Sequence, residues 1–288
     1  METHVLEARL LNHVGQAIKN YGLIQGGDRI MVGLSGGKDS YTLLHLLRKL
    51  AARSPEKFEL VAVNLDQGHP GFPAQLLEDY LKDLGVPYKM LKQDTYSIVK
   101  RLVPEGKTYC SVCSKLRRGV LYNAAVELGC NKIALGHHRD DLIETLLMSA
   151  LYAGAIKSMP PYLRSRDGRN VVIRPMCTAP EEEIAEFAKA MAFPIIPCNL
   201  CGSQVLMRTR VKKLLRDLQA ENRAVKGNLL HALSNVVPSH LMDSKLFPVG
   251  QAQGADPWLD DEEADEDDGG CGSAEAKPPK LTQLRVES

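Results

Sequence analysis

Residues 35–40 combine side chains that bind phosphate with one that binds a metal ion. The preceding residues 28–34 are typical of a short buried strand, and the apolar run 41–47 is typical of a helix. A glycine-rich turn between a strand and a helix directs backbone N–H groups and a helix dipole at an anion. Glycine lets the backbone approach that anion, while hydroxyl and ammonium groups add donors and positive charge. The sequence therefore predicts a nucleotide-phosphate site formed by Ser35, Gly36, Gly37, Lys38, Asp39 and Ser40.

Asp39 is the unusual member of this segment, because an acid inside an anion-binding loop is unfavourable unless it holds a cation. Mg²⁺ on the phosphates of ATP would supply that cation. The spacing differs from the GxxxxGK[ST] pattern of Walker A loops and from the GxGxxG pattern of dinucleotide sites. The alternative is an ordinary glycine-rich turn without a ligand.

A second polar segment follows the strand predicted at 132–136, and it reads His-His-Arg-Asp-Asp at 137–141. Acids at the start of the next helix could hold Mg²⁺ or could cap the helix. The strand predicted at 58–66 also ends in polar residues, and ligands of open α/β sheets bind outside the carboxyl ends of the strands. We therefore expect a nucleotide site that includes Gly136, His137, Asp140 and Asp141. The adenosine would be bordered by Asn64, Leu65 and Asp66, unless these three form a plain turn.

Seven cysteines are present, and four of them form Cys-x-x-Cys pairs at 110/113 and 198/201. An odd count and this spacing argue against a disulfide framework and for metal ligation or thiol chemistry. The first pair opens a predicted helix, where the dipole favours thiolates. From the residues alone, the pairs could form a four-thiolate zinc site or an iron–sulfur site. No chemistry is assigned to Cys130 and Cys177, which are expected in the core, or to Cys271 in the tail.

Strand and helix patterns alternate along most of the chain, which predicts an α/β fold with a doubly wound parallel sheet. The helices are predicted at 5–24, 39–52, 74–84, 94–102, 110–129, 140–152, 179–193, 203–219 and 227–236. The strands are predicted at 28–34, 58–66, 86–91, 132–136 and 171–175. The basic residues 153–170, which are rich in turn formers, are expected to form a loop or hairpin on the active-site side.

Charge is distributed unevenly along the chain. Residues 256–268 hold nine acids and no base, whereas residues 269–288 carry a net charge of +1. Because the whole chain has a formal net charge of +1, residues 1–255 carry +9. Such a basic body suits a polyanion such as RNA, although excess lysine also promotes solubility. We predict one domain over 1–247, with an N-terminal helical segment at 1–27, and a disordered acidic tail at 248–288.

The composition is that of an ordinary soluble protein, with 44% hydrophobic and 25% charged residues. No apolar run approaches the ~20 residues of a membrane-spanning helix. Residues 1–4 lack the basic and apolar regions of a secretory signal. These features predict a cytoplasmic protein that does not contact a membrane.

The SGGKDS segment and the GH-x-x-DD-x-x-ET segment at 136–145 together resemble the PP-loop ATP pyrophosphatase family, which is adenine nucleotide alpha-hydrolase-like and includes the tRNA lysidine synthetases. Members split ATP between its α- and β-phosphates and adenylate a substrate. The cysteine segments, CSVCSKLRRG at 110–119 and PCNLCGSQ at 197–204, closely resemble the tRNA 2-thiocytidine synthetases, the TtcA family. This resemblance runs from about residue 28 to 247 and includes NVVPSHL at 235–241.

The resemblance implies ATP, Mg²⁺ and a [4Fe-4S] cluster as cofactors. In that family three cysteines hold the cluster, and the matching positions are Cys110, Cys113 and Cys201. The fourth iron stays open and can carry sulfur, which leaves Cys198 as a fourth ligand, a sulfur relay or a spectator. The implied reaction adenylates the C2 carbonyl oxygen of cytidine 32 in tRNA, and sulfur then displaces AMP.

The same resemblance implies roles for the charged residues. Asp39 and either Asp140 or Asp141 would hold Mg²⁺, and Lys38 would offset phosphate charge. Two basic stretches are candidate tRNA contacts, with a solvated helix face as the alternative: Lys115, Arg117 and Arg118, and then Arg208, Arg210, Lys212, Lys213 and Arg216. The expected partners are tRNA, a cysteine desulfurase as sulfur donor, and a second copy in a homodimer.

Three other functions remain as alternatives. Lysidine synthesis by a PP-loop enzyme does not explain the cysteine pairs. Uridine thiolases of the superfamily carry further Cys-x-x-Cys pairs at both ends of the chain, and this chain has none before Cys110 and only Cys271 after Cys201. A zinc-stabilised RNA-binding protein would not require intact SGGKDS and HHRDD segments.

Overall fold

The computed structural model describes residues 2–69, 71–103, 110–196 and 206–246. The chain divides into two compact units, residues 1–234 and 235–288. The described part of the second unit, residues 235–246, contains a short 3₁₀ helix at Pro238–His240. The predictions made for Cys198, Cys201, Cys271 and the acidic tail lie outside the described residues.

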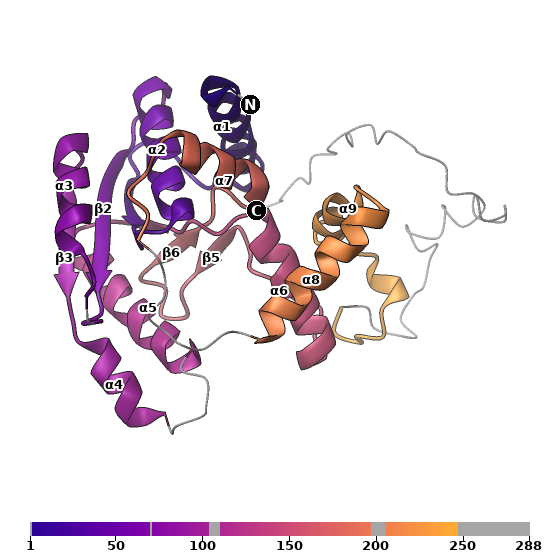
Figure 1. Ribbon diagram of the computed structural model, residues 1–288. Coiled ribbons are helices and arrows are strands. Elements are labelled where there is room, and N and C mark those ends of the chain that lie inside the picture. Colours follow the sequence, from indigo (N-terminus) through magenta and orange to yellow (C-terminus); the bar gives the residue numbers. More distant parts are fainter. Residues whose placement is uncertain (1, 70, 104–109, 197–205, 247–288) are drawn as a thin grey trace, which may run out of the picture. The chain divides into compact units, whose positions relative to one another are not determined.

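One mixed sheet organises the first unit, with strand order β3-β2-β1-β4-β6-β5 within the described residues (Figure 1). Its strands are β1 Arg29–Gly33, β2 Glu59–Asp66, β3 Tyr88–Lys92, β4 Lys132–Ala134, β5 Tyr162–Arg164 and β6 Val171–Ile173. Neighbouring strands pair in parallel except β5, which pairs antiparallel with β6. The predicted α/β fold with a doubly wound, mostly parallel sheet is confirmed, and an antiparallel edge strand is added.

The central strands β1, β2, β4 and β6 are largely buried because helices cover both faces of the sheet, whereas the edge strand β5 is exposed. Within β1, Ile30 and Val32 belong to one hydrophobic cluster and Met31 belongs to another, as the period-two alternation of a strand requires. The first cluster contains apolar residues of α1 Thr3–Tyr21, α2 Lys38–Arg53, α3 Ala74–Leu84 and α7 Glu181–Ala190. The second contains residues of α5 Cys110–Glu127. Continuous apolar strands are therefore explained by two covered faces.

A smaller group of helices packs beside the sheet. Ile143 of α6 Arg139–Ala153 contacts Val211 and Leu215 of α8 Leu206–Glu221, and α9 Val225–Ala232 joins the same cluster. The remaining helix, α4 Thr95–Leu102, begins at the side-chain cap that Asp94 provides to Ser97. None of the described helices is long and apolar enough to cross a membrane.

The strand order reverses between β1 and β4, because β2 and β3 follow on one side of β1 while β4 and β6 lie on the other. Such a switch point opens a crevice at the carboxyl ends of the two central strands, where ligands of doubly wound folds bind. SGGKDS follows β1 and HHRDD follows β4. The two polar segments singled out in the sequence therefore meet at this crevice.

Residues 153–170 include the predicted hairpin, β5–β6, and their first part lies on the predicted active-site side. Ser158 donates its hydroxyl to the Leu142 carbonyl oxygen, and the Pro160 carbonyl oxygen accepts a hydrogen bond from Arg174, which also contacts His137. The basic turn of the hairpin lies at the opposite edge. Because β6 runs parallel to β4, the turn that enters β6 lies at the amino-terminal edge of the sheet. A polar cavity of about 340 Å³ at that edge is lined by residues that include Asp28, Lys132, Arg164 and Arg169. Lys132 and Asp28 form a buried ion pair of 2.6 Å there.

Candidate active site

The loop between β1 and α2 is held in shape by its own hydroxyl groups. Ser40 donates its hydroxyl to the Gly37 carbonyl oxygen at 2.9 Å and accepts the Ser35 backbone N–H at 3.2 Å. The Gly37 N–H reaches the Ser35 hydroxyl at 3.4 Å. Gly37 is the N-cap of α2. Because glycine has no side chain, the backbone N–H groups in the first turn of the helix remain accessible to an anion.

Gly136 permits close packing around this loop. A Cβ on Gly136, in the loop after β4, would lie 3.0 Å from the Asp39 carbonyl carbon and 3.2 Å from the Ser40 nitrogen. Those neighbours are backbone atoms that cannot move aside. Gly136 therefore allows the loops after β1 and β4 to touch, which brings Asp39 beside the HHRDD segment.

Asn64 supports the loop from the neighbouring strand. Its side-chain amide donates to the Leu34 carbonyl oxygen at 2.7 Å, and the residue is almost fully buried. Leu65 is also buried, and the Asp66 carboxylate accepts the Gly68 N–H at 2.9 Å. Of the three residues expected to border the adenosine, Asn64 is thus engaged in fixing the end of β1.

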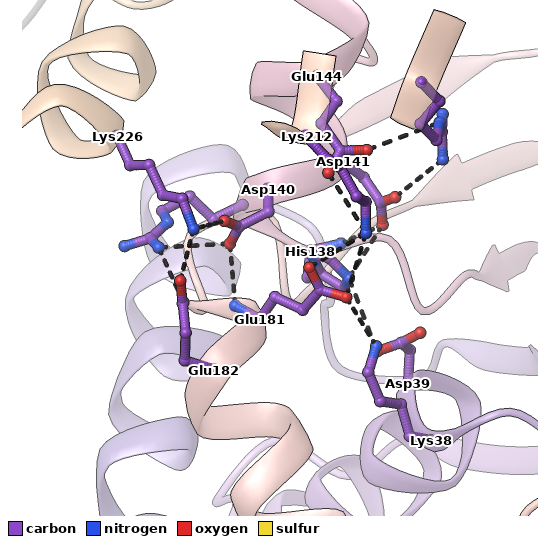
Figure 2. Close-up of polar contacts among 12 residues, drawn as sticks. Lys38, Asp39, His138, Asp140, Asp141, Glu144, Glu181, Glu182, Lys212 and Lys226 are labelled. Atoms are coloured by element: carbon purple, nitrogen blue, oxygen red, sulfur yellow. Dashed lines mark hydrogen bonds and ion pairs between the residues drawn. The ribbon is translucent and has the colours of Figure 1, made fainter. Parts of the chain in front are cut away.

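Three helices begin at this edge, and each has an acid in its first turn: Asp39 in α2, Asp141 in α6 and Glu181 in α7. His138, which is buried, lies between two of them, with Nε2 3.7 Å from Asp39 Oδ1 and 3.4 Å from Asp141 Oδ2. Figure 2 shows these side chains pointing toward one another from separate elements. The positive ends of three helix dipoles therefore converge on one small region.

Lysines from two elements meet at Glu181. Lys38 donates to Asp39 Oδ1 at 2.8 Å and to Glu181 Oε1 at 3.2 Å. Lys212 of α8 reaches the same Oε1 atom at 3.4 Å. Burial opposes the positive charge on Lys38, but Asp39 and Glu181 outweigh it and raise the pKa of that ammonium group. Both lysines are therefore charged, and they lie on either side of one carboxylate.

Glu144 is the most enclosed acid of the cluster, with only 2% of the residue exposed. Lys212 Nζ lies 3.5 Å from its Oε1, and Arg208 Nε lies 3.6 Å from its Oε2, which accepts no hydrogen bond. Burial raises the pKa of Glu144 to about 7, although Lys212 and Arg208 act in the opposite direction. A buried carboxylate oxygen that accepts no hydrogen bond is costly, which makes Glu144 a candidate functional residue.

The adjacent acids Asp140 and Asp141 have different surroundings. Asp140 is buried, pairs with Lys226 of α9 at 2.7 Å and accepts the Glu181 N–H at 2.9 Å. Asp141 accepts the His138 N–H at 3.2 Å and contacts Arg208 at 3.3 Å, on the side of Asp39. Asp140 therefore ties α6 to α7 and α9, whereas Asp141 faces the phosphate-binding loop (Figure 2).

His137 lies behind this group and is neutral. Its Nδ1 accepts a hydrogen bond from Arg174 Nε at 3.2 Å. Burial, and then the charge of Arg174, lower the pKa of His137 to about 4. Its other ring nitrogen therefore carries the proton and is a donor.

The first cysteine pair lies at the same edge of the sheet. α5 begins at Cys110, and one turn later the Cys113 thiol contacts the Gln67 side-chain oxygen at 3.3 Å, just beyond the end of β2. Lys115, Arg117 and Arg118 are exposed along the helix that follows. Cys130 and Cys177 are buried in the hydrophobic core as expected, and burial raises the pKa of Cys177 to about 11.

The chain matches the model of the PP-loop domain family over residues 6–215. It is 66% identical to the tRNA-cytidine(32) 2-sulfurtransferase of Anaeromyxobacter sp. (strain K) over 277 residues, which cover 96% of this chain and 94% of that protein. The chain belongs to the tRNA-cytidine(32) 2-sulfurtransferase family of PP-loop enzymes.

More distant relatives agree with this membership. The tRNA-cytidine(32) 2-sulfurtransferase of Burkholderia mallei (strain SAVP1) is 57% identical over 248 residues, covering 86% of this chain and 75% of that protein. Among solved structures, the U34-tRNA thiolase NcsA from Methanococcus maripaludis with its [4Fe-4S] cluster aligns with a TM-score of 0.66. The alignment has 22% sequence identity and covers 80% of this chain and 79% of NcsA, so the two proteins share a fold.

The basic residues predicted as tRNA contacts on α8 fall into two groups. Arg208 and Lys212 turn toward the acids of the crevice, whereas Arg210, Lys213 and Arg216 are exposed. The signal was present in the sequence, since Arg208 and Lys212 share a helix face with the apolar Val211 and Leu215. Glu181 and Lys226 were not predicted as site residues, because nothing near them in the sequence resembles a motif.

The acids of the crevice suit Mg²⁺ bound to a nucleotide. Among the described residues, no three His, Cys, Asp or Glu side chains are arranged as a ready metal site. Asp39 and Asp141 lie on two sides of His138 and could supply oxygen ligands. Mg²⁺ commonly uses one or two carboxylates together with substrate phosphates and water, so two acids are sufficient.

Proposed function

We propose that this chain converts cytidine 32 of tRNA to 2-thiocytidine in an ATP-dependent reaction. The observation that carries the proposal is 66% identity to a tRNA-cytidine(32) 2-sulfurtransferase along nearly the whole chain. The convergence of Lys38, Asp39 and Asp141 at the switch point of the sheet supports an ATP-binding half-reaction.

In the first step, the C2 oxygen of cytidine attacks the α-phosphorus of ATP. A bond forms between that oxygen and phosphorus, and the bond to pyrophosphate breaks. Asp39 and Asp141 would hold Mg²⁺, and Lys38 would offset phosphate charge. The loop residues Ser35 to Ser40 and the neutral donor His137 would complete the nucleotide site, together with Gly136 and the residues at the end of β2. Asp140 would position α6 through Lys226 and Glu181.

In the second step, sulfur that a dithiol or similar reductant has brought to the sulfide level attacks C2. A C2–S bond forms, the C2–O bond breaks, and AMP leaves with the former carbonyl oxygen. A [4Fe-4S] cluster held by Cys110, Cys113 and Cys201 would present sulfur to the activated base. The half-buried Cys113 thiol at the start of α5 suits a thiolate ligand, since it lies at a helix N-terminus and at the same sheet edge as the nucleotide loop. Cys198 is either a sulfur relay or a bystander.

The proposal also names the partners of the enzyme, its oligomeric state and its domain bounds. The exposed bases of α5 and of the outer face of α8 would contact tRNA phosphates. A cysteine desulfurase would supply the sulfur, and the enzyme would act as a cytoplasmic homodimer. The catalytic domain would span 1–247, and the acidic segment 248–288 would remain outside the chemistry.

A nucleoside census of tRNA tests the function directly. Total tRNA from cells with and without the gene is digested and analysed by mass spectrometry. We expect 2-thiocytidine only where the protein is present, and its yield in vitro should require ATP, Mg²⁺, a persulfide donor and a two-electron reductant such as a dithiol. Loss of 2-thiouridine or lysidine, with 2-thiocytidine unchanged, would transfer the assignment to one of the other PP-loop activities.

A further inference from the structure

Two cations of α8 reach into the crevice where the phosphate-binding loop lies. Lys212 contacts Glu181 at 3.3 Å and Glu144 at 3.5 Å. Arg208 contacts Asp141 at 3.3 Å and Glu144 at 3.6 Å. Together, Arg208 and Lys212 therefore connect α8 to acids of both α6 and α7.

The acids that hold these cations occupy a position suited to an anion. Each of Asp39, Asp141 and Glu181 lies in the first turn of its own helix, where a dipole favours negative charge. Lys38 and Lys212 both contact Glu181 Oε1, so an anionic oxygen that takes the place of this carboxylate oxygen would lie within reach of both ammonium groups. In the ligand-free enzyme, side-chain carboxylates neutralise the cations that a phosphate would otherwise bind.

We propose that Arg208 and Lys212 bind the β- and γ-phosphates of ATP, and the pyrophosphate product, by exchanging their carboxylate partners for phosphate oxygens. The proposal rests on the proposed function only in its ATP-binding step. The α-phosphate remains attached to the base after the first step, whereas the β- and γ-phosphates carry most of the charge of ATP. Lys38, Arg208 and Lys212 gather where α2, α6 and α7 begin, and their positive charge is complementary to that of the two phosphates.

The packing of α8 explains why these two residues, and not their neighbours, reach the crevice. Val211 and Leu215 are buried against Ile143 of α6, which fixes the rotation of the helix. Arg208 and Lys212 are four residues apart on that same side. Arg210 and Lys213 are exposed and contribute positive charge without entering the cluster, so they are matched controls.

The test compares Arg208→Gln and Lys212→Gln with Arg210→Gln and Lys213→Gln in the full-length enzyme. Calorimetry with Mg²⁺ measures the binding of ATP, pyrophosphate and AMP. Loss of one charged contact should weaken ATP and pyrophosphate binding about 10- to 100-fold. AMP lacks both phosphates, so its affinity should change little, and Lys212→Arg should retain most of the affinity for pyrophosphate. The two controls should bind all three ligands as the wild type does.

Other outcomes would overturn the proposal. If the two residues only fasten α8, the variants will melt at lower temperature while ATP raises the melting temperature as much as in the wild type. If they contact tRNA, tRNA affinity will fall and ATP affinity will not.

A different result would separate this inference from the proposed function. If the wild type makes no 2-thiocytidine but the variants still lose pyrophosphate binding, the thiolation function is contradicted and this inference stands.

Discussion

Ile196 donates its backbone N–H to the Gly36 carbonyl oxygen at 2.9 Å. This hydrogen bond joins the phosphate-binding loop to the segment that leads, two residues later, to Cys198. The side chain of Ile196 packs on the same glycine, whose φ of +83° is rarely adopted by other residues. The loop that would bind ATP and the chain that carries the second cysteine pair are therefore in direct contact.

Replacing Gly36 should disturb this contact. In Gly36→Ala, the new Cβ would lie 2.8 Å from Ile196 Cδ1 and 3.1 Å from Ile196 Cβ, and the backbone would be strained as well. We expect a loss of about 1–3 kcal/mol in the free energy of unfolding, measured by urea denaturation without ATP. Gly37→Ala is the control, because its φ is −86° and its Cβ would meet only the Ser35 hydroxyl at 3.5 Å. Equal losses in both variants would contradict this account.

The neighbouring acids Asp140 and Asp141 should respond differently to amidation. Asp140→Asn removes one of the two carboxylates that pair with the buried Lys226, leaving Glu182, and should reduce the free energy of unfolding by about 1–3 kcal/mol. Asp141→Asn should retain the fold but slow pyrophosphate release by about 100-fold or more, since a metal ligand is lost. Asp39→Asn should resemble Asp141→Asn.

Urea denaturation and pyrophosphate release with tRNA present measure the two effects separately. A stable but inactive Asp140→Asn enzyme, with an active Asp141→Asn enzyme, would reverse the roles. The exposed Glu221→Gln serves as a control for both assays.

Adjacent acids illustrate what the sequence could and could not predict. The strand–loop–helix pattern and the HHRDD motif placed both acids at the nucleotide site, but residues i and i+1 of a helix point about 100° apart. Which of them faces the crevice depends on α7 and α9, which are distant in the sequence. Composition likewise did not show that residues 158–161 lie at the active-site edge while the turn at 165–170 lies at the opposite edge, since it does not reveal the direction of β6.

Glu144 should make stability depend on pH. Its pKa rises from the usual 4.5 to about 7 in the folded enzyme, so the folded state binds the proton more tightly than the unfolded chain does. This contribution stabilises the fold below pH 4.5 and is lost as the pH rises through 7. The rise corresponds to roughly 3 kcal/mol. Of the charged groups around it, Lys212 and Arg208 oppose this rise in the pKa, whereas Asp141 and Glu181 add to it.

Glu144→Gln removes this titration. Relative to the wild type, the variant should therefore gain stability between pH 4.5 and pH 8, by as much as roughly 3 kcal/mol. The measurement is urea denaturation of both proteins at each pH, without Mg²⁺ or ATP, with Glu221→Gln as the exposed control. A pH-independent difference between Glu144→Gln and the wild type would show that the Glu144 carboxyl titrates normally.

Variants of Cys198 and Cys201 should distinguish a cluster with one open iron from a metal site closed by four thiolates. Anaerobically purified enzyme should be brown and oxygen-sensitive, because three thiolate ligands leave one iron without a protein ligand. Cys201→Ala should then lose iron and 2-thiocytidine formation together, whereas Cys198→Ala should keep most of its iron. The remaining activity of Cys198→Ala will distinguish a sulfur relay from a bystander.

Cys130→Ala is the matched control for both cysteine variants, since Cys130 is buried in the core and should influence stability without changing the iron content. Iron per protein and 2-thiocytidine yield are measured for all three variants under anaerobic conditions. Equal iron loss in Cys198→Ala and Cys201→Ala would indicate four thiolate ligands and leave no open iron for sulfur. One zinc per chain with no iron would replace the cluster by a structural site. Neither result would alter the ATP half-reaction, because Lys38, Asp39 and Asp141 meet without any contribution from the cysteines.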